Sequence, residues 1–182
     1  MTLLIVIAVL ALLVLWFINA QRELVKHDEL TKNALSQIGV QQQSRWDALT
    51  ALAELVKSYN EHEYNTLRDV IAQRRPIDGN SSAADADLQD SLMGQVASRL
   101  SVVVEQYPDI KANENYGKAM DAVDKYTNMV RTSKMVYNDT ATKYNKLIRQ
   151  IPDSIVASIF NFQVREYLKV EDQKTGMPSL KV

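Results

Sequence analysis

The chain has 182 residues and a net charge of −1, with 21 Lys and Arg against 22 Asp and Glu. This balance offers no basic excess for nucleic acid, so no nucleic-acid partner is predicted. The absence of cysteine excludes disulfides, thiolate metal sites and cysteine nucleophiles. Only five Gly and four Pro occur, which favours long helices over a turn-rich sheet protein.

The first 21 residues contain no charged side chain, and every residue from Leu3 to Ile18 is apolar. At ~1.5 Å per residue, a helix over residues 1–21 covers the ~30 Å hydrocarbon core of a bilayer. We therefore predict a transmembrane anchor over residues 1–21. The principal anchor residues are Leu3, Leu4, Ile5, Val6, Leu10, Leu13, Trp16 and Phe17.

Two alternatives to a transmembrane helix are a cleaved signal peptide and a buried core helix. A signal peptide has a basic start and a small-x-small cleavage site. Here no Lys or Arg precedes the apolar run, and the only candidate site, Ile18-Asn19-Ala20, carries a bulky isoleucine. A core helix of a soluble protein seldom stays apolar on all sides over such a length. The transmembrane interpretation is therefore preferred.

The charges that flank the anchor predict its orientation. Arg22, Lys26 and Lys32 follow the apolar run, whereas nothing basic precedes it. The positive-inside rule then places the N-terminus outside and the C-terminal body in the cytoplasm. Residues 22–34 are interpreted as a helical juxtamembrane connector.

Beyond the connector, apolar residues recur at alternating steps of three and four, which predicts one bundle-facing helix from about Leu30 to Arg74. Gly39 and the stretch Ser58–Glu63 are the positions where this helix could bend. The sequence Pro76–Asp85 has the composition of a loop.

A second helix is predicted to start at Ser82, because an acid at Asp85 three residues later completes an N-cap pattern. It runs to about Gln106 and ends at Tyr107-Pro108-Asp109, since the residue before proline avoids the helical region.

The third helix is predicted to begin at an Asn113 N-cap and to end before Pro152. It has the most regular heptads of the chain, of the kind found in coiled coils. Asp153 is interpreted as the cap of a short helix, Ser154 to Phe160. The polar tail, residues 169–182, is expected to be loose.

These elements predict an all-α fold: an N-terminal transmembrane helix, then an antiparallel bundle of three long helices plus a short fourth, over residues 35–168. The second helix is much shorter than the other two. If the long loop lets it sit toward the membrane end, Glu105 comes near Gln42 and Arg45. A Glu105–Arg45 ion pair is therefore expected.

Gln42 and Arg45 are polar residues in an otherwise apolar helix seam. Long polar side chains can extend from a bundle edge into water. Alternatively they form a buried or partner-facing polar layer that fixes helix register. With Glu105, these residues are the candidate partner or polar-layer positions. Tyr137 and Tyr144, one heptad apart, are interpreted as core residues rather than a binding box.

No catalytic or metal-binding motif is recognised. The two histidines, His27 and His62, lack a Glu three residues before them, so the di-iron pattern is absent. His62-Glu63 begins like a zinc-protease helix, but Thr66 stands where the second histidine is needed. The prediction is a non-enzyme without a cofactor, and a metal-dependent hydrolase built on His62 and Glu63 is the least favoured alternative.

Several motifs, spread over nearly the whole chain, resemble the LemA family. The motifs are Gln37-Ile38-x-Val40-Gln41, Arg45-x-Asp47, Glu105-x-Tyr107-Pro108-Asp109-Ile110-Lys111-Ala112-Asn113, Tyr137-Asn138, Tyr144-Asn145 and Ile151-Pro152. The resemblance implies a helical bundle tethered to the bacterial cytoplasmic membrane, with the body inside. It supplies no catalytic residue to transfer.

The chain also departs from the family pattern. The family usually has Trp, Asp, Leu, Arg and Pro at the positions of Leu35, Gly39, Gln42, Ser44 and Thr50. It often has Glu at Thr127 and Arg at Lys134, so a salt bridge between that pair in relatives does not carry over to this chain.

The leading functional hypothesis is a scaffold or adaptor of the cytoplasmic membrane, whose partners are the lipid bilayer and other membrane proteins. The alternative is a homo-oligomer that organises the membrane. The anchor has no Gly-x-x-x-Gly motif, so it provides little signal for its own dimerisation.

Overall fold

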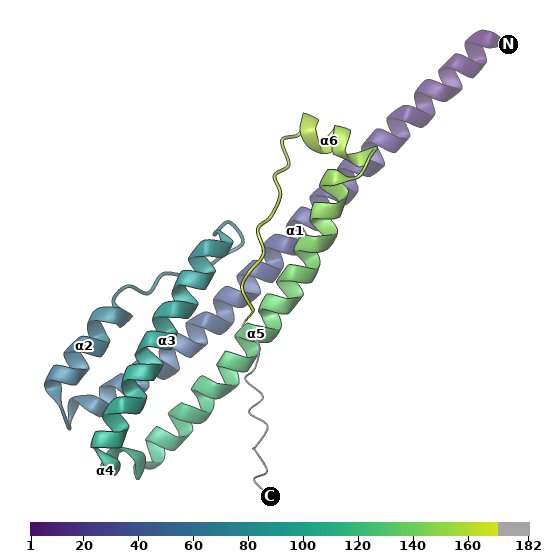
Figure 1. Cartoon of the computed structure of the whole chain (residues 1–182). Helices are drawn as coiled ribbons and strands as arrows, with labels where there is room; N and C mark the ends of the chain where they lie inside the picture. The colour runs from purple at the N-terminus through teal and green to yellow at the C-terminus, as the bar shows by residue number, and fades with distance from the viewer. Residues whose placement is uncertain (171–182) are drawn as a thin grey trace, which may run out of the picture.

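The computed structural model describes residues 1–170 of the chain (Figure 1). Over these residues the protein is all-helical, which confirms the predicted fold class. The helices are α1 (Thr2–Lys57), α2 (Glu61–Ile71), α3 (Ala83–Gln106), α4 (Pro108–Lys111), α5 (Glu114–Arg149) and α6 (Asp153–Ile159).

Helix α1 is continuous over 56 residues, so the predicted anchor, the connector and the start of the body form one rod. Its N-terminal part projects beyond the other helices (Figure 1). The side chains of Leu3 and Leu4 are 70% exposed, and Ala20 is the first buried residue of the helix. By length and composition this part of α1 can cross a membrane.

Helix α1 runs through Gly39 without interruption. A Cβ atom at this position would lie 1.9 Å from the carbonyl oxygen of Ile77, in the loop between α2 and α3. The glycine therefore allows that loop to lie directly against the helix backbone.

The prediction of a single helix from Leu30 to Arg74 was wrong, but the break falls within Ser58–Glu63, one of the two positions where a bend was expected. Helix α1 ends at Lys57, and the chain reverses through Ser58–Asn60. The Asn60 side chain then caps α2 by accepting a hydrogen bond from the Glu63 amide at 3.1 Å. A polar cap at the turn supplies the stop that neither Gly nor Pro marks. The apolar spacing continues through the turn because both helices face one core.

Helix α2 runs back along α1. The Tyr64 hydroxyl donates to the Glu54 carboxylate at 2.8 Å, and the Arg74 guanidinium, just beyond α2, contacts Asp47 at 2.9 Å. The loop continues in the same direction as far as Gly79, which lies beside Lys32.

The predicted helix starts at Ser82 and Asn113 are confirmed. Ser82 and Asp85 form a reciprocal capping box: the Ser82 hydroxyl accepts from the Asp85 amide at 3.0 Å, and Asp85 accepts from the Ser82 amide at 3.1 Å. Asn113 caps α5 by accepting from the Asn115 amide at 2.9 Å. Pro108 ends α3 and begins the single turn α4.

Helices α1 and α3 run in one direction and α2 and α5 in the other. Gln42 lies beside Ala86 near the start of α3, and Asn60 lies beside Tyr107 just after its end. Helix α3 therefore lies beside the half of the body that is far from the apolar run, not toward the membrane end as predicted. The reason is that α2 and the loop after it already bring the chain back along α1 before α3 begins. Glu105 consequently lies about four turns along α3 from the level of Arg45.

After α6, residues 161–170 return along the bundle without regular secondary structure (Figure 1). We call this segment the strap. The Asn145 side chain exchanges two hydrogen bonds with the backbone of Arg165, at 2.8 and 2.9 Å. Asn138 does the same with Leu168, at 2.9 Å each, and Leu168 is 3% exposed. Of the predicted loose tail, residues 171–182 lie outside the described part of the chain.

Candidate functional site

A groove of about 850 Å³ opens between α3 and α5, and buried polar side chains are among the residues that line it. Such a volume falls in the ordinary range of binding sites. The residues that line it are Arg45, Asp87, Asp90, Ser91, Gly94, Gln95, Ser98, Arg99, Val102, Thr127, Val130, Arg131, Lys134 and Lys169.

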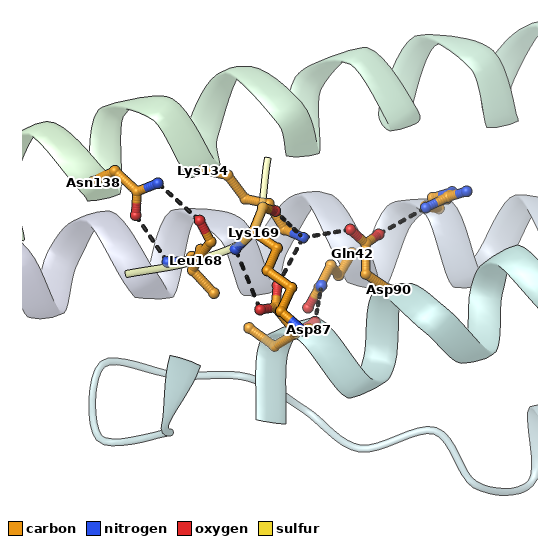
Figure 2. A network of polar contacts seen from close by, with 9 residues as sticks. Gln42, Asp87, Asp90, Lys134, Asn138, Leu168 and Lys169 are labelled. Carbon is orange, nitrogen blue, oxygen red and sulfur yellow. Dashed lines mark hydrogen bonds and ion pairs between the residues drawn. The ribbon is translucent and has the colours of Figure 1, made fainter. Parts of the chain in front are cut away.

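Lys134 of α5 is at the centre of a polar network and is only 5% exposed (Figure 2). Its ammonium donates to Asp87 at 3.0 Å, to Asp90 at 2.5 Å and to the Lys169 carbonyl at 3.2 Å. Burial favours the neutral amine, but the contacts with Asp90 and Asp87 outweigh it, so the pKa of Lys134 lies above its usual value. One charged side chain thus connects α5, α3 and the strap.

Arg45 and Gln42 extend this network from α1. Arg45 is 9% exposed, and its guanidinium contacts Asp90 at 2.8 Å. Gln42 is 2% exposed and donates to the Ala86 carbonyl at 2.8 Å. Both side chains are therefore buried between helices rather than extended into water. A lengthwise shift of α3 against α1 would break both contacts, which is the arrangement expected of a layer that fixes helix register.

Three further cations line the groove: Arg99, Arg131 and Lys169. Arg99 contacts Glu63 of α2 through two hydrogen bonds, at 2.7 and 2.9 Å, and these hold the pKa of Glu63 below its usual value. Arg131 and Lys169 form no ion pair with any residue in the range 1–170. The Nε atom of Arg131 is buried and lacks a hydrogen-bond partner there.

The groove is consequently cationic and has open space. It is lined by five cations against two carboxylates, and Glu63 neutralises one cation from its edge. At Gly94 a Cβ atom would meet nothing within 4 Å, so the wall leaves room beside the helix backbone. This combination suits an acidic ligand group.

A second polar cluster connects the strap to the part of α1 nearer the apolar run. Asp28 contacts Lys32 at 2.8 Å and Arg165 at 2.7 Å. Burial alone would raise the pKa of Asp28, but the bonds from Lys32 and Arg165 prevail and hold it below its usual value. Burial beside Asp28 raises the pKa of Tyr144 to about 12.

The structure brings together two of the three predicted polar-layer residues. Gln42 and Arg45 lie side by side in the network, whereas Glu105 is exposed near the far end of α3. The expected Glu105–Arg45 pair does not form, because α3 places Asp90 at the level of Arg45. Whether any of the three contacts a partner stays a prediction.

Sequence reasoning missed Asp87, Asp90, Arg131 and the central role of Lys134. The available signal was a lysine between Val130 and Tyr137, inside the apolar seam of α5. Its ion pairs are with Asp87 and Asp90 of α3, far away in sequence.

Tyr137 and Tyr144, 3% and 1% exposed, are core residues as predicted. Of the two residues on which the hydrolase hypothesis rests, Glu63 forms an ion pair with Arg99, and His62 is exposed. Among residues 1–170, no group of three His, Asp or Glu side chains is placed to hold a metal ion.

Fold and site together define a helical bundle built on a helix whose first part is apolar enough to cross a membrane, with a buried polar layer under a cationic groove. The model of the LemA family matches residues 34–181, which is most of the sequence. The chain therefore belongs to the LemA family, as the motifs indicated.

Two curated relatives match part of the chain. They are the magnetosome proteins MamQ 1 and MamQ 2 of Paramagnetospirillum magneticum, each 32% identical over 80 residues. The matched segment covers 44% of this chain and 29% of each relative, so the chain aligns with less than a third of either protein.

Proposed function

We propose that the protein is a non-catalytic adaptor of the bacterial cytoplasmic membrane that binds an acidic segment of another membrane protein in the α3–α5 groove. The apolar run of α1 spans the bilayer with the N-terminus outside, and the bundle stands in the cytoplasm. Arg22, Lys26 and Lys32, which follow the run, support this orientation.

The observation that carries the proposal is the position of the groove on a rigid rod. Because α1 is one helix from anchor to body, the groove is held at a fixed height above the bilayer. A partner in the same membrane can then meet the groove by lateral diffusion alone.

Charge supports an acidic partner. Arg131 and Lys169 line the groove and have no ion pair within residues 1–170, and the buried Nε atom of Arg131 has no hydrogen-bond partner there. Carboxylates that reached this wall would gain charge-assisted hydrogen bonds, and the guanidinium favours bidentate carboxylate geometry.

The test is photo-crosslinking in native membranes with a benzophenone amino acid at Gln95, which is exposed and lines the groove. The matched control places the same probe at Val136, 53% exposed on α5 but outside the groove. The proposal predicts a defined adduct from Gln95 only, containing a membrane protein with an acidic cytoplasmic segment. Equal labelling from both positions, or an adduct with a second copy of this chain alone, would refute it.

The chain itself continues after Val170 with the acidic residues Glu171 and Asp172. A variant that ends at Val170 tests whether they compete for the same cations. If they do, the truncated protein gives a stronger adduct from Gln95.

A further inference from the structure

Helix α6 has one buried and one exposed apolar face. Val156 and Ala157 are fully buried and pack against Ala20 and Leu24 of α1. These contacts attach the short helix to α1 just beyond the end of the apolar run at Ile18. Figure 1 shows α6 at the end of the bundle from which that run projects.

The opposite face of α6 is made of large apolar side chains that point away from the protein. Ile155 and Ile159 are 55% and 62% exposed, and they lie four residues apart on one side of the helix. Ile151 and Phe160 flank them and are 84% and 48% exposed. Such a contiguous apolar surface is unfavourable in water and indicates a contact surface.

The position of this face indicates what covers it. The Phe160 ring lies 6.0 Å from the ring of Phe17, which belongs to the membrane-crossing stretch of α1. The apolar surface of α6 is therefore continuous with the apolar surface of the anchor, at the level where the anchor leaves the hydrocarbon core. Phe162 is packed against the same cluster, so the aromatic side chains form a belt at this level.

Exposed cations lie on the helix ends that pack against α6. They are Arg22 and Lys26 of α1, in the stretch that contains Ala20 and Leu24, and Lys146 and Arg149 in the last turn of α5, beside Leu147 and Ile148. Glu23 pairs with Lys26, and Asp153 is half-buried at the start of α6. The cationic excess matches the anionic headgroups of a cytoplasmic leaflet.

We propose that α6 is a second membrane contact, inserted among the lipid headgroups with Ile151, Ile155, Ile159 and Phe160 directed at the acyl chains. It lies in the interface in the manner of an amphipathic helix, while α1 crosses the bilayer. Two contacts prevent the bundle from rotating about the axis of α1. This inference rests on the membrane anchoring proposed above, and it adds a lipid-binding surface to it.

The absence of cysteine permits a direct test on the full chain. Single variants I155C and I159C are labelled with a nitroxide and reconstituted in nanodiscs that contain anionic lipid. Electron paramagnetic resonance then measures how often each nitroxide collides with oxygen, which concentrates in lipid, and with a nickel chelate, which stays in water. The ratio of the two collision frequencies reports whether the label lies in lipid or in water. L10C in the anchor and V136C on the body are the matched controls, and all four positions are more than half exposed.

The proposal predicts an oxygen-to-nickel ratio at positions 155 and 159 at least about threefold above that at 136, because the side chains sit below the headgroup level. A ratio equal to that at 136, with position 10 in lipid, refutes the inference and leaves the anchor intact. If position 10 also reports water, the anchoring itself fails. Protection from both reagents, with spin broadening that vanishes on dilution with unlabelled protein, shows a second copy on this face and also overturns the proposal.

Discussion

Replacing Lys134 by methionine removes the cation at the centre of the polar layer while keeping a side chain of similar length. Asp87 and Asp90 then lose their ammonium partner, and the Lys169 carbonyl loses its donor. Removing one partner of a buried ion pair costs ~3–5 kcal/mol. The two aspartate side chains are 22% and 25% exposed, so water recovers part of that cost.

We therefore expect K134M to lower the free energy of unfolding by about 2–3 kcal/mol. For a protein of this size, 1 kcal/mol shifts the midpoint by ~2–4 °C, which gives a drop in Tm of about 4–12 °C. The assay is thermal unfolding of the full chain in detergent micelles, followed by circular dichroism.

The matched control is K118M, which removes a lysine of the same helix from an exposed pair with Glu114. That change should shift Tm by less than about 1 °C, because exposed pairs contribute little. The double variant K134M/D87N should recover part of the loss, since one unpaired carboxylate becomes neutral. If K134M and K118M unfold at the same temperature, the layer does not hold the helices in register.

Three further predictions concern packing, pH and the strap. G39A should destabilise the protein by more than about 2 kcal/mol, because its methyl group would overlap the Ile77 carbonyl. G94A, with open space around it, should instead stabilise α3 by ~0.5–1 kcal/mol, and equal Tm shifts in the two variants would contradict this. Asp28, with its lowered pKa, contributes stability that is present above its unfolded pKa and lost as the pH falls through the folded value. The Tm difference between wild type and D28N should therefore shrink below about pH 4, and a difference that grows there would be incompatible with the Arg165 contact. N138A removes both hydrogen bonds to Leu168, so hydrogen exchange at the Leu168 amide should accelerate by about tenfold or more, whereas T132A should leave it unchanged.

Local sequence signals were sufficient for much of this fold. The uncharged apolar run marked the exposed part of α1, and capping residues at Ser82 and Asn113 marked the starts of α3 and α5. These features depend on neighbours within a few residues, which a single sequence displays directly.

The reversal at Ser58–Asn60 was harder to predict, because α1 and α2 present apolar residues to one core and the spacing survives the turn. The error had a consequence further along, since without the return passage of α2 the level of α3 was misplaced and Glu105 was paired with Arg45. Asn60 as a cap was the available signal.

The network and the strap depend on contacts that no local pattern encodes. Lys134 meets Asp87 and Asp90 across 47 and 44 residues of sequence, and Arg165 meets Asp28 across 137. The strap is held by Asn138 and Asn145 through hydrogen bonds to backbone, so it carries no apolar periodicity that would reveal its position.

The proposal that the groove binds an acidic partner is tested most directly by reversing one charge in its wall. R131E is introduced together with the benzophenone probe at Gln95, and K118E, outside the groove, is the control for a charge change on the same helix. If the cationic groove is the partner site, R131E abolishes the adduct while K118E preserves it, and thermal unfolding shows that both variants are folded. An adduct of unchanged yield from R131E would contradict the cationic groove as the partner site.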